Sequence, residues 1–207
     1  MATIKSNVKL KLVAKQNTPK QSHQDLMEKR IADGLKLRRD ELELSVTDLA
    51  EKSGVSRAMI SKIERLEASP TAALLGRLCN GLGITLSSLI ASAETAASPP
   101  IARAGDQPVW RDPGTGLLRT MISPRNTSSR VEIVQLELPV GVEVHYEPVR
   151  NSYDQHLVIL QGKLSLVEGE DEFELHAGDC MHSRVDVAHT FSNRGRGPCK
   201  YLVVIAR

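Results

Sequence analysis

Thirteen consecutive residues, VHYEPVRNSYDQH at positions 144–156, bring together side chains that can bind a metal ion or an organic ligand. They include two histidines, two tyrosines, an arginine and several acidic or amide groups. A second stretch, AGDCMHSRVDVAHTFSN at 177–193, adds two more histidines and another arginine. Imidazole and carboxylate groups suit a divalent cation, whereas arginine and tyrosine suit an organic anion. Which chemistry applies depends on which of these side chains share a face.

Both stretches lie among runs that alternate apolar and polar residues, as half-buried strands do. The clearest is RVEIVQLEL at 130–138. The other strand candidates, separated by glycines at turn spacing, are HLVILQG at 156–162, KLSLVEG at 163–169, EFELHAG at 172–178 and YLVVIA at 201–206. Many short strands with regular turn signals predict a β-sandwich or barrel.

Residues 25–90 instead follow the helical period and predict five short helices. Leu26, Met27, Ile31 and Leu35 space out an apolar stripe on the first helix. The second predicted helix begins with a capping box of Ser45 and Asp48 and ends at Gly54, and the third has Ser56 as its N-cap. The fourth has Pro70 in its first turn and ends at Gly83, and Thr85 is the N-cap of the fifth. Together the five helices predict a compact bundle.

Composition separates the two halves of this 207-residue chain. All six aromatic residues and five of the six histidines lie beyond position 100. The first hundred residues hold fifteen Lys and Arg against eleven Asp and Glu, and the rest hold twelve against fourteen. A basic first half indicates a polyanionic partner for that half alone. The domains are predicted at 1–24 (a basic tail, or an arm that contacts phosphates), 25–91 (helical), 92–103 (linker) and 104–207 (β-rich).

The three cysteines are far apart and form no CxxC pair, so neither a disulfide framework nor a zinc knuckle is indicated. No apolar run reaches the ~18 residues of a membrane helix. Lysines interrupt the apolar residues of the N-terminus, unlike those of a secretory signal. We therefore expect a soluble, cytoplasmic protein without a membrane partner.

The segment around residues 31–90 resembles the lambda-repressor-like helix-turn-helix regulators, also called the xenobiotic response element family. The resemblance rests on LAEKSGVS, ISKIE, SPT and LGI occurring together. It implies a recognition helix from Ser56 to Arg65 that lies in the major groove of double-stranded DNA. The candidate DNA contacts are Ser56, Arg57, Ala58, Ser61, Lys62 and Arg65.

Within that helix the resemblance implies that Arg57, Ala58 and Lys62 read bases, while Ser61 and Arg65 contact phosphate. DNA would repel Glu64, so an ion pair with Arg38 or Arg39 suits it better. One such unit covers a single half-site, and two half-sites lie about one turn apart, ~34 Å. We therefore expect a homodimer.

Residues 131–205 resemble the cupin barrel, a double-stranded jelly roll, through PVGVEVHYE…DQHLVILQG and AGDCMHSRVDVAHTFSN. In metal-binding cupins the first motif supplies two histidines at i, i+2 and a glutamate, and the second supplies a third histidine. Here the corresponding positions hold His145, Glu147, Gln155 and His189. The fold class is therefore an all-α five-helix bundle followed by an all-β cupin.

Three hypotheses remain for the barrel. One is a divalent metal ion held by His145, Glu147, Gln155 and His189. Another is a metal-free pocket for a small polar effector, and the last is a polar mouth that binds nothing. The candidate effector contacts are His145, Glu147, Arg150, Tyr153, Gln155, His156, Arg184 and His189. Gln155 and His156 point to opposite faces, which leaves open which of them lines the pocket.

The planar guanidinium of arginine can donate two parallel hydrogen bonds to a carboxylate, so a lining of this kind suits an amino acid or a related metabolite. Trp110 and Arg119, which precede the barrel, could cover its mouth, although a packed core role is commoner for tryptophan. The two resemblances together imply a transcriptional regulator, such as a repressor, that senses an amino acid, amine or sulfur compound. The alternative is a non-haem iron dioxygenase-like enzyme with an appended DNA-binding domain; we favour the non-enzyme.

Overall fold

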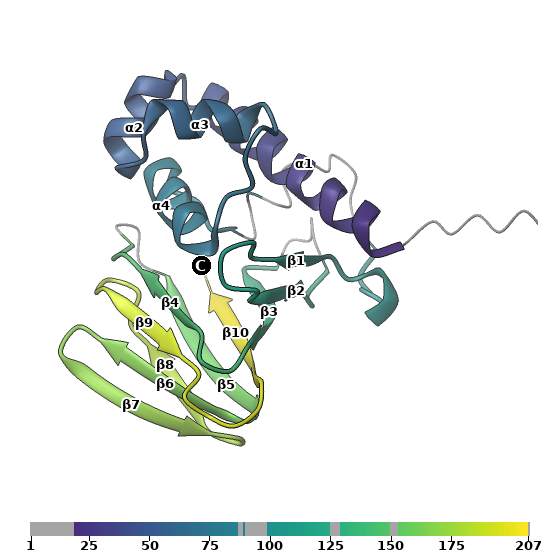
Figure 1. Cartoon of the computed structure of the whole chain (residues 1–207), viewed down its shortest axis with the longest axis vertical. Coiled ribbons are helices and arrows are strands. Elements are labelled where there is room, and N and C mark those ends of the chain that lie inside the picture. The colour runs from purple at the N-terminus through teal and green to yellow at the C-terminus, as the bar shows by residue number, and fades with distance from the viewer. Residues whose placement is uncertain (1–18, 87–88, 90–98, 125–128, 150–152, 207) are drawn as a thin grey trace, which may run out of the picture.

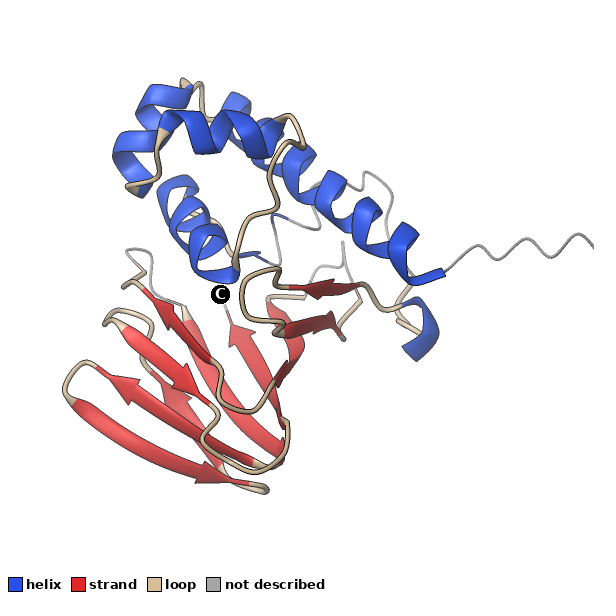
Figure 2. Ribbon diagram, viewed as in Figure 1, coloured by secondary structure: helices blue, strands red, loops and turns tan. Residues whose placement is uncertain are grey.

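The computed structural model describes residues 19–86, 89, 99–124, 129–149 and 153–206. A helical domain lies at one end and a β domain at the other (Figures 1 and 2). The helices are α1 (Pro19–Glu41), α2 (Val46–Ser53), α3 (Arg57–Glu64) and α4 (Ala72–Leu82), and a 3-10 turn, η1 (Ala104–Asp106), precedes the strands. The strands are β1 (Val109–Arg111), β2 (Leu118–Met121), β3 (Val131–Leu138), β4 (Glu143–Tyr146), β5 (Asp154–Gln161), β6 (Lys163–Glu168), β7 (Asp171–His176), β8 (Cys180–Ser183), β9 (His189–Ser192) and β10 (Cys199–Ala206).

Local hydrogen bonds start and end the helices largely where the sequence predicts. The Ser45 hydroxyl accepts from the Asp48 amide, and the Asp48 carboxylate accepts from the Ser45 amide, so the capping box is present. Gly54 ends α2 with φ +66° and Gly83 ends α4 with φ +65°, a left-handed conformation that favours glycine.

Three predictions about the helices need correction. The first helix begins at Pro19, within the predicted tail; residues 1–18 lie outside the described part of the chain. The described residues contain four α-helices, not five: of the predicted fifth, only Leu86 and Leu89 are described as helical, and residues 87–88 and 90 are not described. The fourth helix begins at Ala72 with Thr71 as its cap, so Pro70 precedes it.

The ten strands in the described part of the chain form two antiparallel sheets. The six-stranded sheet has the order β1-β2-β3-β10-β5-β8, and the four-stranded sheet has the order β4-β9-β6-β7. Because β10 pairs with both β3 and β5, the last strand of the chain lies at the centre of the larger sheet. Its alternating burial, with every second residue inside, is the period that YLVVIA predicts.

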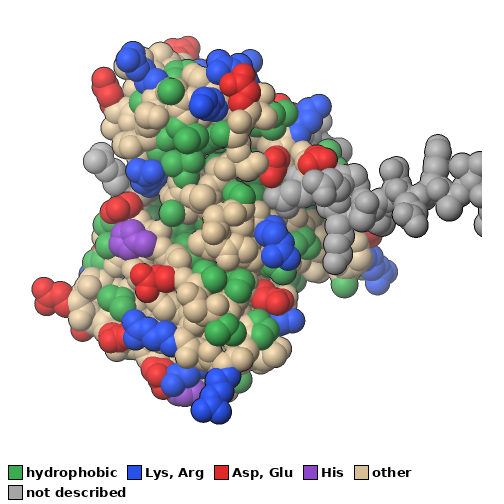
Figure 3. All heavy atoms as spheres, in the orientation of Figure 1, with side chains coloured by type: hydrophobic (Ala, Val, Ile, Leu, Met, Phe, Trp, Pro, Cys, Tyr) green, Lys and Arg blue, Asp and Glu red, His purple; other side chains and the backbone are tan. Residues whose placement is uncertain are grey.

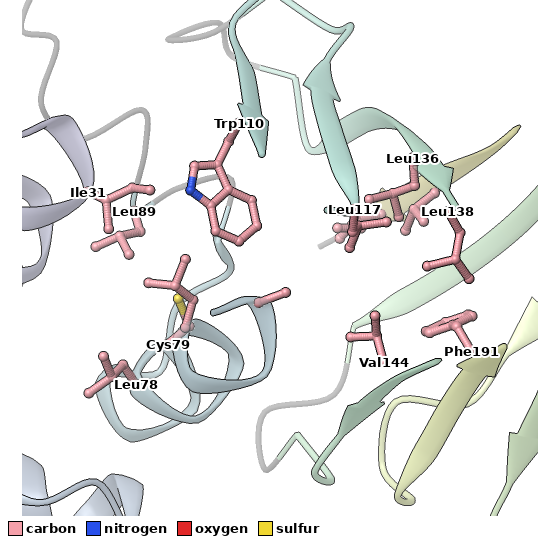
Figure 4. Packing of buried hydrophobic residues seen from close by; sticks show 14 of the residues in the cluster. Ile31, Leu78, Cys79, Leu89, Trp110, Leu117, Leu136, Leu138, Val144 and Phe191 are labelled. Atoms are coloured by element: carbon pink, nitrogen blue, oxygen red, sulfur yellow. The ribbon is translucent and has the colours of Figure 1, made fainter. Parts of the chain in front are cut away.

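One continuous apolar core runs through both domains. Trp110 of β1 is 1% exposed, and Figure 4 shows it on the side of the β domain that faces Ile31, Cys79 and Leu89. The helical domain therefore packs directly against the β domain, through α1 on β1 and α4 on β4. In the described part of the chain, none of the helices combines the length and apolar character needed to cross a bilayer.

Candidate functional site

The α3 helix divides cleanly into a buried face and an exposed face. Ile60 and Ile63 are buried in the helical core, as the helical period predicts. Arg57, Ala58 and Lys62 are exposed on the opposite side. Figure 3 shows Lys and Arg side chains on this end of the molecule, interspersed with acidic ones. This is the geometry of a helix that can enter a major groove.

Ser56 and Arg65, two of the remaining predicted DNA contacts, are already engaged in local interactions. Ser56 is the N-cap of α3, and its hydroxyl accepts from the Met59 amide. The Arg65 guanidinium donates to both carboxylate oxygens of Glu67 at 2.8 and 3.0 Å. These hydrogen bonds lower the pKa of Glu67 and raise that of Arg65. Arg65 can therefore reach a phosphate only in competition with Glu67.

The structure selects Arg39, rather than Arg38, as the partner of Glu64. Arg39 Nε lies 2.7 Å from Glu64 Oε1, and Nη2 lies 3.1 Å from Oε2. The hydrogen bond that Arg39 donates to Glu64 raises the pKa of Arg39 despite its partial burial. Arg38 instead pairs with Glu41 on the exposed surface of α1. The predicted ion pair for Glu64 is confirmed.

A cavity of about 100 Å³ lies between the two domains. Its walls combine residues of α4 and the following segment with residues of both sheets. From the helical domain they are Ala72, Gly76, Cys79, Asn80, Ile84, Thr85 and Leu86. From the β domain they are Arg119, Leu136, Tyr146, Glu147, Val149, Tyr153, Gln155, His189, Phe191, Tyr201, Val203 and Ile205.

Four of the predicted effector residues line this cavity: Glu147, Tyr153, Gln155 and His189. His156 and Arg184 are exposed and do not line it. Arg150 lies outside the described residues. Of the pair Gln155 and His156, the buried residue is therefore Gln155, while His156 packs on the outer face beside His182, with the two rings tilted by 50°.

His145 also points away from the cavity, because β4 has the opposite alternation to the one that the motif implies. Val144 and Tyr146 face the interior, and Tyr146 pairs with His189 across β4 and β9. His145 pairs with Thr190 on the outer face, where its Nδ1 lies 2.9 Å from the Thr190 hydroxyl. Directly opposed residues share a face, so His145 and His189 lie on opposite sides of one sheet.

This arrangement does not fit the predicted metal site. His145 faces outward, and Glu147 follows the end of β4 with its side chain 57% exposed. The described residues contain no group of three or more His, Cys, Asp or Glu side chains placed to hold a metal ion. His145 Nε2 lies 3.5 Å from Glu147 Oε1 on the outside, whereas Gln155 and His189 face the cavity. In the described residues these four side chains therefore do not converge on one ligand set of the kind that the iron chemistry of the enzyme alternative needs.

Gln155 belongs to a buried polar network that the sequence motifs do not indicate. Gln155 Nε2 donates to the Ser183 hydroxyl at 3.3 Å, and that hydroxyl donates to Glu168 Oε1. Glu168 also accepts from the Arg184 amide at 3.0 Å. The alternation along β6 could have shown that Glu168 faces inward. Its hydrogen bond with Ser183 could not be predicted in this way, because it depends on how distant strands are arranged.

His189 is neutral in this environment. Burial lowers its pKa, and its Nδ1 lies 3.1 Å from the Val187 carbonyl, which fixes the proton on that nitrogen. Its ring stacks on Tyr146 with centroids 5.4 Å apart. It can therefore accept a hydrogen bond through Nε2, but it contributes no positive charge to the cavity at neutral pH.

Arg119 supplies that charge instead. It lines the cavity from β2, outside both cupin-like motifs. From the sequence, Arg119 is expected only at the mouth of the barrel, together with Trp110. Trp110 is buried in the core, so its covering role is not observed.

Comparisons with known proteins agree with this two-domain architecture. Residues 35–89 match the helix-turn-helix family, and residues 136–205 match the cupin domain family. The HTH-type transcriptional regulator SutR of Escherichia coli (strain K12) is 30% identical over 162 residues, which cover 78% of this chain and 85% of SutR. The regulator PuuR of the same organism is 23% identical over 79% of this chain and 88% of PuuR.

Among solved structures, the HTH_3 family transcriptional regulator from Vibrio cholerae superposes with a TM-score of 0.72 at 23% identity. The match covers 88% of this chain and 97% of the Vibrio protein, so the two share their fold across both domains. The exposed face of α3, the β domain packed against α1 and α4, and the 30% identity with SutR lead to the same conclusion. The chain belongs to the family of HTH-type transcriptional regulators that join a DNA-binding helix-turn-helix domain to a C-terminal cupin domain.

Proposed function

We propose that a small metabolite, from the classes of amino acids, amines or sulfur compounds, enters the cavity between the domains and changes operator affinity. The observation that carries the proposal is the position of α4. This helix forms one wall of the cavity and also supports the turn of the helix-turn-helix. A ligand in the cavity therefore touches the DNA-binding domain directly.

On the cavity side, α4 meets the β domain closely. A Cβ added at Gly76 would lie 3.2 Å from Cδ1 of Tyr146, which is tighter than ordinary van der Waals contact. The Asn80 amide donates to the carbonyl of Pro148, one turn further along the helix. Because Tyr146 is itself a cavity wall, a shift of its ring upon ligand binding acts on Gly76.

On its other side, α4 meets the turn between α2 and α3. Arg77 Nη1 donates to the Gly54 carbonyl at 3.4 Å. A Cβ at Gly81 would lie 3.0 Å from Ser53 Cβ, so α2 and α4 are also in close contact. Movement of α4 therefore displaces the turn that orients α3. Coupling of this kind is typically about 1–3 kcal/mol, a change of roughly 5- to 150-fold in affinity.

The protein would act as a homodimer on two half-sites. One recognition helix contacts one half-site, and a second copy places another about one helical turn, ~34 Å, away. A change in the orientation of α3 in both copies alters that spacing, and thereby the operator affinity.

The test combines ligand binding with operator binding on the full-length protein. Candidate metabolites are first ranked by thermal shift, and operator affinity is then titrated with and without each one that binds. We expect Gly76→Ala to change operator affinity without ligand and to reduce the response to ligand. Alanine also raises helix propensity by ~1 kcal/mol, so Gly76→Ala is repeated in a Tyr146→Ala background, which removes the ring and with it the contact at Cδ1.

Suppression of the Gly76→Ala effect by Tyr146→Ala supports transmission through this contact. A metabolite that binds in the cavity but leaves operator affinity unchanged would contradict the proposed function.

A further inference from the structure

The Arg119 side chain is fixed on the interior face of the six-stranded sheet by strand register. Arg119 pairs with Trp110 of β1 and with Leu136 of β3, and Leu136 pairs in turn with Tyr201 of β10. Directly paired residues on antiparallel strands share a face. Leu136 and Tyr201 both line the cavity, and Trp110 is buried beside it. The guanidinium therefore belongs to the cavity wall.

The surroundings of Arg119 are of low polarity. Burial raises the pKa of Cys79 and of Tyr146 to about 12, and raises that of Tyr201 as well. The positive charge of Arg119 opposes the rise in all three, so its guanidinium lies within electrostatic reach of each of them. Charge–charge interactions are much stronger here than in water.

The chemistry of this wall selects one class of ligand. Arginine presents its N–H groups in a planar fork that matches a carboxylate. Much of the rest of the lining is apolar, including Leu136, Phe191, Val203 and Ile205. One water needs about 10–15 Å³, so a cavity of about 100 Å³ holds a ligand of only a few heavy atoms beyond its carboxylate.

We propose that Arg119 binds the carboxylate of a small effector whose apolar body lies against Phe191 and Ile205. This inference rests on the proposed function and narrows its ligand class. An amine without a carboxylate would meet the repulsion of Arg119 in the interior. The carboxylate of Glu147 lies at the exposed rim, where water screens its attraction for such an amine.

Matched probes of similar shape test the charge requirement in the full-length protein. Isocaproate is compared with isocaproamide, and leucine with isopentylamine, by thermal shift and calorimetry at millimolar concentration. We expect at least one of the carboxylates to bind, and neither the amide nor the amine to match it. Arg119→Met should weaken carboxylate binding about 10- to 100-fold, the usual effect of losing a charge-assisted pair.

Arg194→Met is the matched control, because Arg194 is an exposed arginine of the same domain that does not line the cavity. We expect it to bind the carboxylates as the unmodified protein does. Arg119→Lys keeps the positive charge but loses the planar pair of N–H donors, so it should bind the carboxylates with intermediate affinity. This variant also serves in place of Arg119→Met if Arg119→Met fails to fold.

Any of three results would overturn the assignment of Arg119. The first is that isocaproamide or isopentylamine binds as tightly as the carboxylates. The others are that Arg119→Met binds the carboxylates as tightly as the unmodified protein does, or that the unmodified protein binds neither carboxylate. Operator affinity is measured in the same samples. Carboxylate binding that needs Arg119 but leaves operator affinity unchanged would contradict the proposed function while supporting this subsite.

Discussion

Arg39 of α1 and Glu64 of α3 form a bidentate ion pair at the end of α3, with N–O distances of 2.7 and 3.1 Å. The two side chains are only 12% and 9% exposed. Arg39 also donates to the Leu44 carbonyl at 2.9 Å, so one guanidinium connects α1, the start of α2 and α3. This pair fixes the position of α3 in its domain.

Removing one partner should therefore destabilise the helical domain. We expect Glu64→Gln or Arg39→Met to lower the free energy of unfolding by about 2–4 kcal/mol, because a largely buried charge loses its partner. Urea denaturation followed by circular dichroism measures the change. Arg38→Met, which removes only an exposed pair with Glu41, should cost less than about 1 kcal/mol. Equal losses in the two arginine variants would show that the pair is not the stabilising element.

Arg57 should carry base recognition, since it is exposed at the first turn of α3. Replacing it with alanine should lower affinity for the operator about 10- to 100-fold and abolish specific protection at physiological salt. A footprinting titration checks this. Arg194→Ala removes an exposed arginine of the β domain, which is ion-paired with Glu172, and should leave the footprint unchanged. A footprint that persists in Arg57→Ala would refute the recognition-helix assignment.

Glu67 should weaken DNA binding, because its ion pair with Arg65 competes with a contact between Arg65 and a DNA phosphate. Its pKa is lowered by the hydrogen bonds from Arg65, so it remains ionised at neutral pH. We expect Glu67→Gln to tighten binding several-fold for any sequence and to steepen the salt dependence by about 0.9 in log–log slope, the value of one phosphate contact. Adding Arg65→Ala should abolish the gain. An unchanged salt slope in Glu67→Gln would show that Arg65 makes no phosphate contact.

Stability should fall on acidification because of His189. Burial lowers its pKa below 6.5 in the folded protein, while the unfolded chain retains the ordinary value. Below about pH 6.5 the unfolded chain therefore binds more protons, and stability declines until pH reaches the lowered folded pKa. Denaturant titrations from neutral pH to about pH 5 should show a flatter profile for His189→Gln. The same profile for both proteins would mean that His189 does not titrate differently on folding.

The sequence predicted much of the helical domain because the signals there are local. A capping box, a left-handed glycine and a 3.6-residue period each act within a few residues, and they placed α2 and α3 and the two faces of α3. Period-two alternation likewise located β3, β5, β6, β7 and β10. The motifs in each half were sufficient to identify both domain families.

The cavity was less predictable, because its lining depends on which distant segments pair. His145 and Tyr146 are neighbours in sequence, and only the pairing of β4 with β9 decides which of them faces inward. The choice between Gln155 and His156 has the same cause. A one-residue difference in register reverses every side chain on a strand, so the motif positions alone did not define the site.

By itself, the sequence determined that a DNA-binding helical unit is joined to a cupin, since caps, turns and periodicity depend on near neighbours along the chain. Tertiary structure alone decided that Arg39 rather than Arg38 holds Glu64, that Tyr146 rather than His145 faces His189, and that α4 closes the cavity over Arg119. These contacts join residues that are 25 or more positions apart, and only the packed fold brings them together.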